Sequence, residues 1–70
     1  MRINVVVQGP EKAGKGTLMA FLVHQLRAHG IEVAVQGAET HNREKLERPD
    51  DALIARLREC QVVLTEQQTH

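Results

Sequence analysis

The chain of 70 residues lacks Trp and Tyr, has one Phe and one Cys, and carries no net charge, because nine Lys and Arg balance nine Asp and Glu. The near absence of aromatic rings excludes stacking platforms for single-stranded nucleic acid, and the balanced charge excludes a general attraction to nucleic acid or anionic membranes. A lone Cys60 excludes an intramolecular disulfide and suits a reducing compartment. The apolar run 5–7 is too short for a membrane span. We therefore expect a cytoplasmic protein that binds neither nucleic acid nor membranes.

The chain does contain enough apolar residues for one small globular domain. They make up 41% of the sequence, and the core must be built from Val, Leu, Ile and Ala. A domain of this size buries only about 60% of its unfolded surface, which predicts marginal stability. From Thr65 onward the sequence is polar. We expect a single domain over residues 1–64 and a flexible C-terminal tail over residues 65–70.

Strand-like and helical patterns alternate along the chain. β-branched and apolar residues predict buried strands at residues 3–8, 31–37 and 62–64. Helical spacing predicts a helix over residues 15–29, stopped by Gly30, and a second helix from Pro49 to about Cys60. The first helix is expected to have an apolar face of Leu18, Phe21, Leu22 and Leu26, and Met19 and Val23 extend its apolar band towards a second face, so that both sides should be covered. The apolar stripe of the second helix is Leu53, Ile54 and Leu57. The order β-α-β-α-β predicts an α/β fold, in which the helices cover a minimal three-stranded parallel sheet.

The segment between the first strand and the first helix reads Gly9-Pro10-Glu11-Lys12-Ala13-Gly14-Lys15-Gly16-Thr17. Glycines let a backbone curl tightly, so that successive N–H groups point at one anion. The start of the following helix adds free N–H groups and the positive end of the helix dipole. Lys15 brings a mobile positive charge to the same place. Residues 9–17 therefore predict a phosphate-binding loop.

The Gly14-Lys15-Gly16-Thr17 sequence resembles the loop of P-loop NTPases, in particular nucleoside monophosphate kinases such as adenylate kinase. Gly9-Pro10-Glu11 and residues 26–33 look more like thymidylate kinase. The resemblance covers roughly the first half of the chain and implies ATP or GTP with Mg²⁺ as ligands. It implies that Lys15 contacts the outer phosphates and Thr17 lies near the α-phosphate. Where the usual pattern places a hydroxyl, this chain has Gly16, so a metal near Thr17 would be held through water. The family also implies strand order 2-3-1.

Other candidate residues follow the second and third expected strands. Glu66 could hold a metal or activate water, or it could be a solvated carboxylate at the start of the tail. Glu39 and Thr40 could contact a ligand at the sheet edge or simply cap a turn. Arg43 belongs to a charged stretch that is read as solvent-facing surface. The four histidines show no spacing typical of a structural metal site.

These observations lead to one function and two alternatives. The first is a nucleotide-binding P-loop protein with at most weak or partner-dependent NTPase or phosphoryl-transfer activity, since the chain is too short for a complete monophosphate kinase. The second is a non-catalytic regulatory or inhibitory interaction module on a degenerate P-loop scaffold. The third is a protein that completes another subunit's site, with Lys15 or Arg43 acting in trans. The open sheet edge predicts a homo-oligomer, most simply a twofold dimer, and the compact size suits a virus or mobile element.

Overall fold

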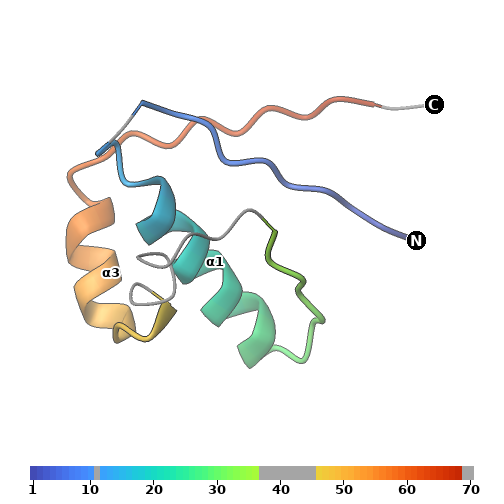
Figure 1. Cartoon of the computed structure of the whole chain (residues 1–70), viewed down its shortest axis with the longest axis horizontal. Helices are drawn as coiled ribbons and strands as arrows, with labels where there is room; N and C mark the ends of the chain where they lie inside the picture. The colour runs from blue at the N-terminus through green and yellow to red at the C-terminus, as the bar shows by residue number, and fades with distance from the viewer. Residues whose placement is uncertain (11, 37–45, 69–70) are drawn as a thin grey trace.

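Helices α1 and α3 lie beside each other in the described part of the protein (Figure 1). The computed structural model describes residues 1–10, 12–36 and 46–68. Helix α1 spans Lys15–Ala28 and helix α3 spans Asp50–Leu57, and the two pack against each other. Extended segments lead into α1 from the N-terminus and out of α3 to the C-terminus (Figure 1). Within these residues no helix is long and apolar enough to cross a membrane.

Helix α1 begins and ends where the glycines of the sequence predict. Gly14 is its N-cap, with φ of 100°, and Leu18 N–H donates the first helical bond to the Gly14 carbonyl at 2.9 Å. At the other end Gly30 has φ of 76°, a left-handed conformation that suits glycine. Gly30 and Ile31 N–H groups donate to the carbonyls of Arg27 and Leu26, each at 3.0 Å. These paired bonds form a Schellman motif, so the predicted stop is confirmed.

Helix α3 begins at the predicted proline. Pro49 is its N-cap with extended backbone, and Asp50 and Asp51 occupy the first turn, where the helix dipole favours negative charge. The Pro49 carbonyl accepts hydrogen bonds from the N–H groups of Ala52 and Leu53 at 3.1 and 3.3 Å. The regular helix ends at Leu57, three residues before the predicted end at Cys60.

The core between the helices is small and is built on the second of the two expected α1 faces, the one that contains Val23. Buried in the described structure are Thr17, Ala20 and Val23 of α1 and Leu53 of α3. The α1 residues recur every three positions, so they share one stripe, and two of them are small enough to let α3 approach closely. The predicted face is only half-buried, and Leu26 at its end is exposed. Leu53 confirms the stripe predicted for α3, whose Ile54 and Leu57 are half-buried.

The α/β prediction is wrong. In residues 1–10, 12–36 and 46–68 there is no β-strand, so neither the three-stranded parallel sheet nor the order 2-3-1 is present. The expected strands are extended backbone, but they are not buried: Val5 is 70% exposed and Val63 is 75% exposed. The P-loop NTPase resemblance therefore does not describe this fold, because a P-loop in that superfamily joins a central strand to a helix.

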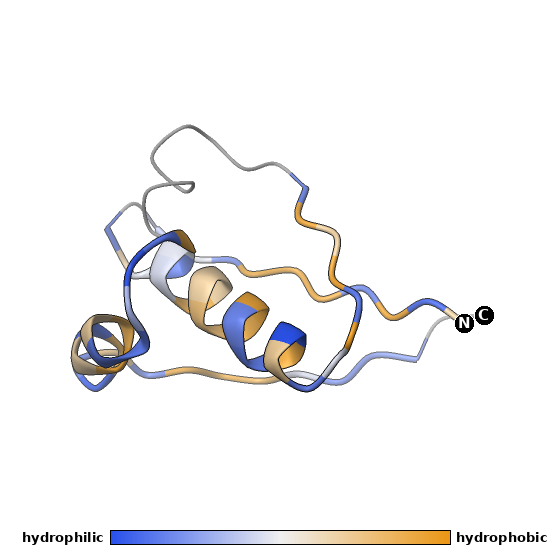
Figure 2. Cartoon of the chain, turned by 90° about the horizontal axis from the view of Figure 1, so that it is seen from below, coloured by the Kyte–Doolittle hydropathy of each residue, from blue (hydrophilic) through white to orange (hydrophobic). Residues whose placement is uncertain are grey.

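Local sequence explains why the segments are extended, whereas a sheet depends on pairing between distant segments. β-branched residues favour extended backbone, but a ladder needs a second segment about 5 Å away in register. Both terminal segments carry long apolar stretches (Figure 2). Instead of pairing, residues 5–10 and 60–64 line a common cleft.

Candidate functional site

The cleft that the terminal segments share also reaches the glycine-rich loop. It has a volume of about 260 Å³. We call it the terminal cleft, and its lining consists of residues 5–10, Ala13, Gly14, Lys15, Leu18, Leu22, Leu57 and residues 60–64. Most of this lining is apolar, and among the described residues Lys15 is its one cationic side chain. The cleft therefore brings one positive charge and the start of α1 to a space whose other lining side chains are uncharged.

The loop backbone makes a tight turn before α1. Ala13 N–H donates to the Pro10 carbonyl at 3.2 Å, and Lys12 lies in the left-handed region with φ of 65°. Gly14 follows with φ of 100°. Since helical bonds begin at Leu18, the N–H groups of Lys15, Gly16 and Thr17 have no acceptor within the helix. Such a helix start favours a negative charge.

The predicted binding residues do not all lie in the terminal cleft. Gly9, Pro10, Ala13, Gly14 and Lys15 line it. A Cβ added to Gly9 would lie 3.4 Å from the Ala13 Cβ and 3.5 Å from the Lys15 Cγ, so the loop closes back on the preceding segment.

Lys12, Gly16 and Thr17 are outside the lining, and Glu11 lies outside the described residues. Thr17 is only 3% exposed. Its side chain belongs to the packed interior of the helix pair and not to the open surface of the loop.

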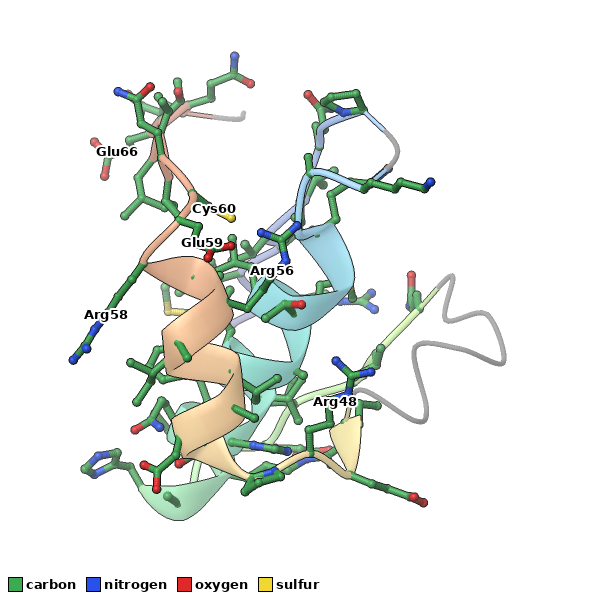
Figure 3. All side chains as sticks on the ribbon, turned by 90° about the vertical axis from the view of Figure 1, so that its left-hand side faces the viewer. Arg48, Arg56, Arg58, Glu59, Cys60 and Glu66 are labelled. Atoms are coloured by element: carbon green, nitrogen blue, oxygen red, sulfur yellow. The ribbon has the colours of Figure 1, made fainter. Side chains whose placement is uncertain are left out.

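The described side chains form no metal-binding cluster of their own for the predicted Mg²⁺. Magnesium requires several oxygen ligands in octahedral geometry. Across the described ranges no group of three or more His, Cys, Asp or Glu residues could hold a metal ion. Glu66 is exposed on the C-terminal segment and does not line the terminal cleft with Lys15 (Figure 3). Glu66 therefore does not share this cleft with Lys15. Glu39, Thr40 and Arg43 lie outside the described residues.

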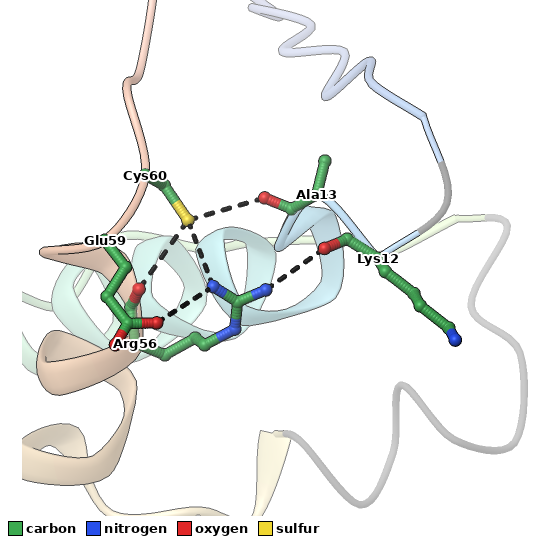
Figure 4. A network of polar contacts seen from close by, with 5 residues as sticks. All are labelled: Lys12, Ala13, Arg56, Glu59 and Cys60. Carbon is green, nitrogen blue, oxygen red and sulfur yellow. Dashed lines mark hydrogen bonds and ion pairs between the residues drawn. The ribbon is translucent and has the colours of Figure 1, made fainter.

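A polar cluster that the sequence did not reveal joins the end of α3 to the loop (Figure 4). The Arg56 Nη2 donates to the Lys12 carbonyl at 3.1 Å, and Nη1 contacts the Cys60 Sγ at 3.6 Å. The Cys60 thiol donates to the Ala13 carbonyl at 3.4 Å. Glu59 pairs with the same guanidinium at 3.5 Å. Because Lys12 and Arg56 are 44 residues apart, no local pattern could have indicated this contact.

His24 forms a second link between the helices that the sequence analysis missed. Its Nδ1 donates to the Asp50 Oδ1 at 2.8 Å and its Nε2 donates to the Leu46 carbonyl. Gln25 Nε2 donates to the other Asp50 carboxylate oxygen at 3.2 Å. Two acceptors on one imidazole favour its protonated form. The hydrogen bond to Asp50, then that to Leu46, raises the pKa of His24 above its ordinary value, against a smaller opposing effect of burial.

Comparison of the chain with protein-family models, with curated proteins and with solved structures found no match.

Proposed function

We propose that this protein binds a phosphate group of a nucleotide, ATP or GTP, at the glycine-rich loop of residues 9–17. The observation that carries the proposal is the position of Lys15, which is the first residue of α1 and lines the terminal cleft. The loop before it turns back on itself through Gly9 and Gly14, which leaves no side chain at the helix cap. The proposal uses this loop and this helix start, and it does not require a sheet.

The physical basis is the combination of a helix start with a cation. The first N–H groups of α1 carry a partial positive charge, and an anion there is stabilised by about 0.3–1 kcal/mol when exposed. Lys15 is half-buried as a residue and is the first residue of the same helix, so a phosphate at the helix start would also be attracted by its charge, more strongly than in bulk water. Neither contribution alone is large, and together they favour a multiply charged ligand such as a di- or triphosphate.

The proposed activity is binding, with phosphoryl transfer at most weak or dependent on a partner. Phosphoryl transfer needs several groups around the transferred phosphate. Of the described charged residues, Lys15 alone lines the terminal cleft, and Glu66 is outside its lining. A partner would have to supply the acid and the further cations.

Isothermal titration calorimetry with ATP, GTP and pyrophosphate, each with and without Mg²⁺, tests the proposal. We expect Lys15→Ala to weaken pyrophosphate binding by about tenfold or more, the effect of losing one charged hydrogen-bond donor. Lys12→Ala is the matched control, because it removes the same charge from the same loop and its side chain extends away from the Arg56 cluster (Figure 4). Equal losses in the two variants, or no binding by the wild type, would contradict the proposal.

A second candidate function, a non-catalytic interaction module, is favoured by the terminal segments. Ile3, Val6 and Leu64 are 88%, 74% and 88% exposed, and these residues belong to extended segments without strand pairing in the described structure. Extended backbone with free N–H and C=O groups can add a strand from another chain. The predicted homo-oligomer would use this surface.

A further inference from the structure

The C-terminal turn of α3 contacts the backbone of the glycine-rich loop at two successive carbonyls. Arg56 donates to the Lys12 carbonyl at 3.1 Å, and the Cys60 thiol donates to the Ala13 carbonyl at 3.4 Å. The two donors also contact each other at 3.6 Å. Figure 4 shows the four groups on the side of the loop that faces α3. The end of one helix therefore holds the segment that starts the other.

These contacts fix the direction of the loop's peptide groups. In a trans peptide the C=O and the following N–H point in opposite directions. With the Lys12 and Ala13 carbonyls held against α3, the Ala13 N–H donates to the Pro10 carbonyl and the Gly14 N–H points away from α3. An anion is repelled by carbonyl oxygens and attracted by N–H groups, so this orientation decides whether the loop surface suits a phosphate.

The loop conformation needs such support because it is strained at a lysine. Lys12 has φ of 65°, a left-handed conformation that is unfavourable for a residue with a Cβ. Strained residues persist where surrounding contacts determine their conformation. The bond from Arg56 is a contact of that kind, because it joins the Lys12 backbone to a separate helix.

We propose that Arg56 is a positioning residue of the phosphate-binding loop, which it holds in its anion-accepting conformation together with Cys60. The inference rests on the proposed function and adds to it a residue outside the loop. Arg56 acts through the loop backbone: its guanidinium is bonded to the Lys12 carbonyl and paired with Glu59 at 3.5 Å. It is not part of the lining of the terminal cleft.

Three arginine variants distinguish a positioning role of the Arg56 guanidinium from an effect of its positive charge alone. Arg56→Met removes the guanidinium and keeps an apolar stem. Arg56→Lys keeps the charge but loses the planar fork that reaches the Lys12 carbonyl and the Cys60 sulfur together. Arg58→Met is the control, since Arg58 leaves the same end of α3 and points away from the loop (Figure 3). The measurements are pyrophosphate affinity by calorimetry, melting temperature, and the amide NMR signals of Ala13 and Gly14 in ligand-free protein.

We expect Arg56→Met and Arg56→Lys each to weaken pyrophosphate binding by about five- to tenfold and to shift both amide signals. The melting temperature should fall by only a few degrees, because the variants lose the bond to the Lys12 carbonyl while the exposed Arg56–Glu59 pair contributes little to stability. Arg58→Met should match the wild type in all three measurements. Cys60→Ala should shift the amide NMR signal of Gly14 in the same direction as the Arg56 variants do.

If Arg56→Lys bound pyrophosphate as tightly as the wild type, the charge of residue 56 alone would explain its effect, and the positioning role would be refuted. Wild-type amide signals in Arg56→Met would overturn the inference entirely. A wild-type protein that binds no pyrophosphate would refute the proposed function, and the amide signals would then decide separately whether Arg56 holds the loop.

Discussion

Gly14 combines two constraints, and the substitution Gly14→Ala violates both. Its φ of 100° disfavours any residue with a Cβ, and an added Cβ would lie 3.1 Å from the Cys60 Sγ. The backbone part costs about 1–2 kcal/mol, offset by about 0.4–1 kcal/mol because alanine restricts the unfolded chain. The contact requires the sulfur to move, which weakens its bond to the Ala13 carbonyl and adds about 0.5–1 kcal/mol. We expect a net loss of roughly 1–2 kcal/mol in the free energy of unfolding.

Gly30→Ala supplies the matched control. Gly30 has φ of 76°, but a Cβ there would meet nothing within 4 Å. Only the cost of the left-handed backbone applies at this position, so we expect Gly30→Ala to lower the free energy of unfolding by about 0.5–1 kcal/mol. Urea denaturation at constant pH measures the loss in the free energy of unfolding for both variants, provided that their m-values agree with that of the wild type. The double variant Gly14→Ala/Cys60→Ala should recover about 0.5–1 kcal/mol relative to additivity, because it removes the crowded sulfur. Equal losses at the two glycines, with no coupling to Cys60, would refute the packing of the loop on α3.

Two further predictions concern pH and self-association. The pKa of His24 is raised in the folded protein above its unfolded-state value of about 6.5. Below about pH 6.5 the bond between His24 and Asp50 therefore contributes its full stabilisation, and this stabilisation is lost as the pH rises through the folded-state pKa. Denaturation curves from pH 5 to 9 should show this decline in the wild type and not in His24→Ala, and parallel profiles would contradict it. The exposed apolar terminal segments predict a concentration-dependent dimer in sedimentation velocity, weakened by Val63→Lys on one such segment. A compact monomer at high micromolar concentration would exclude this use of the segments.

Helix positions are predictable because the signals for them are local. Gly30 ends α1 with left-handed backbone, and Pro49 starts α3 where its missing N–H costs nothing. Each of these signals acts within a few residues of its own position. For the same reason the amino-acid sequence of residues 9–17 is enough to indicate a helix start that carries a lysine.

The absence of a sheet from the described residues is not predictable from the same kind of signal. Residues such as Val5 and Val63 specify extended backbone, but only long-range pairing would turn extended segments into a sheet. The buried stripe of α1 agrees with the prediction at Val23 and differs from it at Leu18 and Phe21, for a related reason. Without a sheet to cover Leu18 and Phe21, the stripe containing Ala20 packs on α3 instead.

The links between the helices depend on contacts across long stretches of sequence. His24 lies 26 residues from Asp50, and Arg56 lies 44 residues from Lys12. In the sequence each has the pattern of an ordinary polar residue on a helix surface. Only the packing of α1 on α3 places these donors opposite their acceptors.

The most direct test of phosphate binding is an amide NMR titration of the wild-type protein with pyrophosphate at low ionic strength. Binding at the loop predicts progressive, saturable shifts of the Gly14, Lys15, Gly16 and Thr17 amides, with little change along α3 apart from its last turn. Unchanged loop amides at millimolar pyrophosphate, or shifts spread evenly over all exposed lysines, would contradict the account.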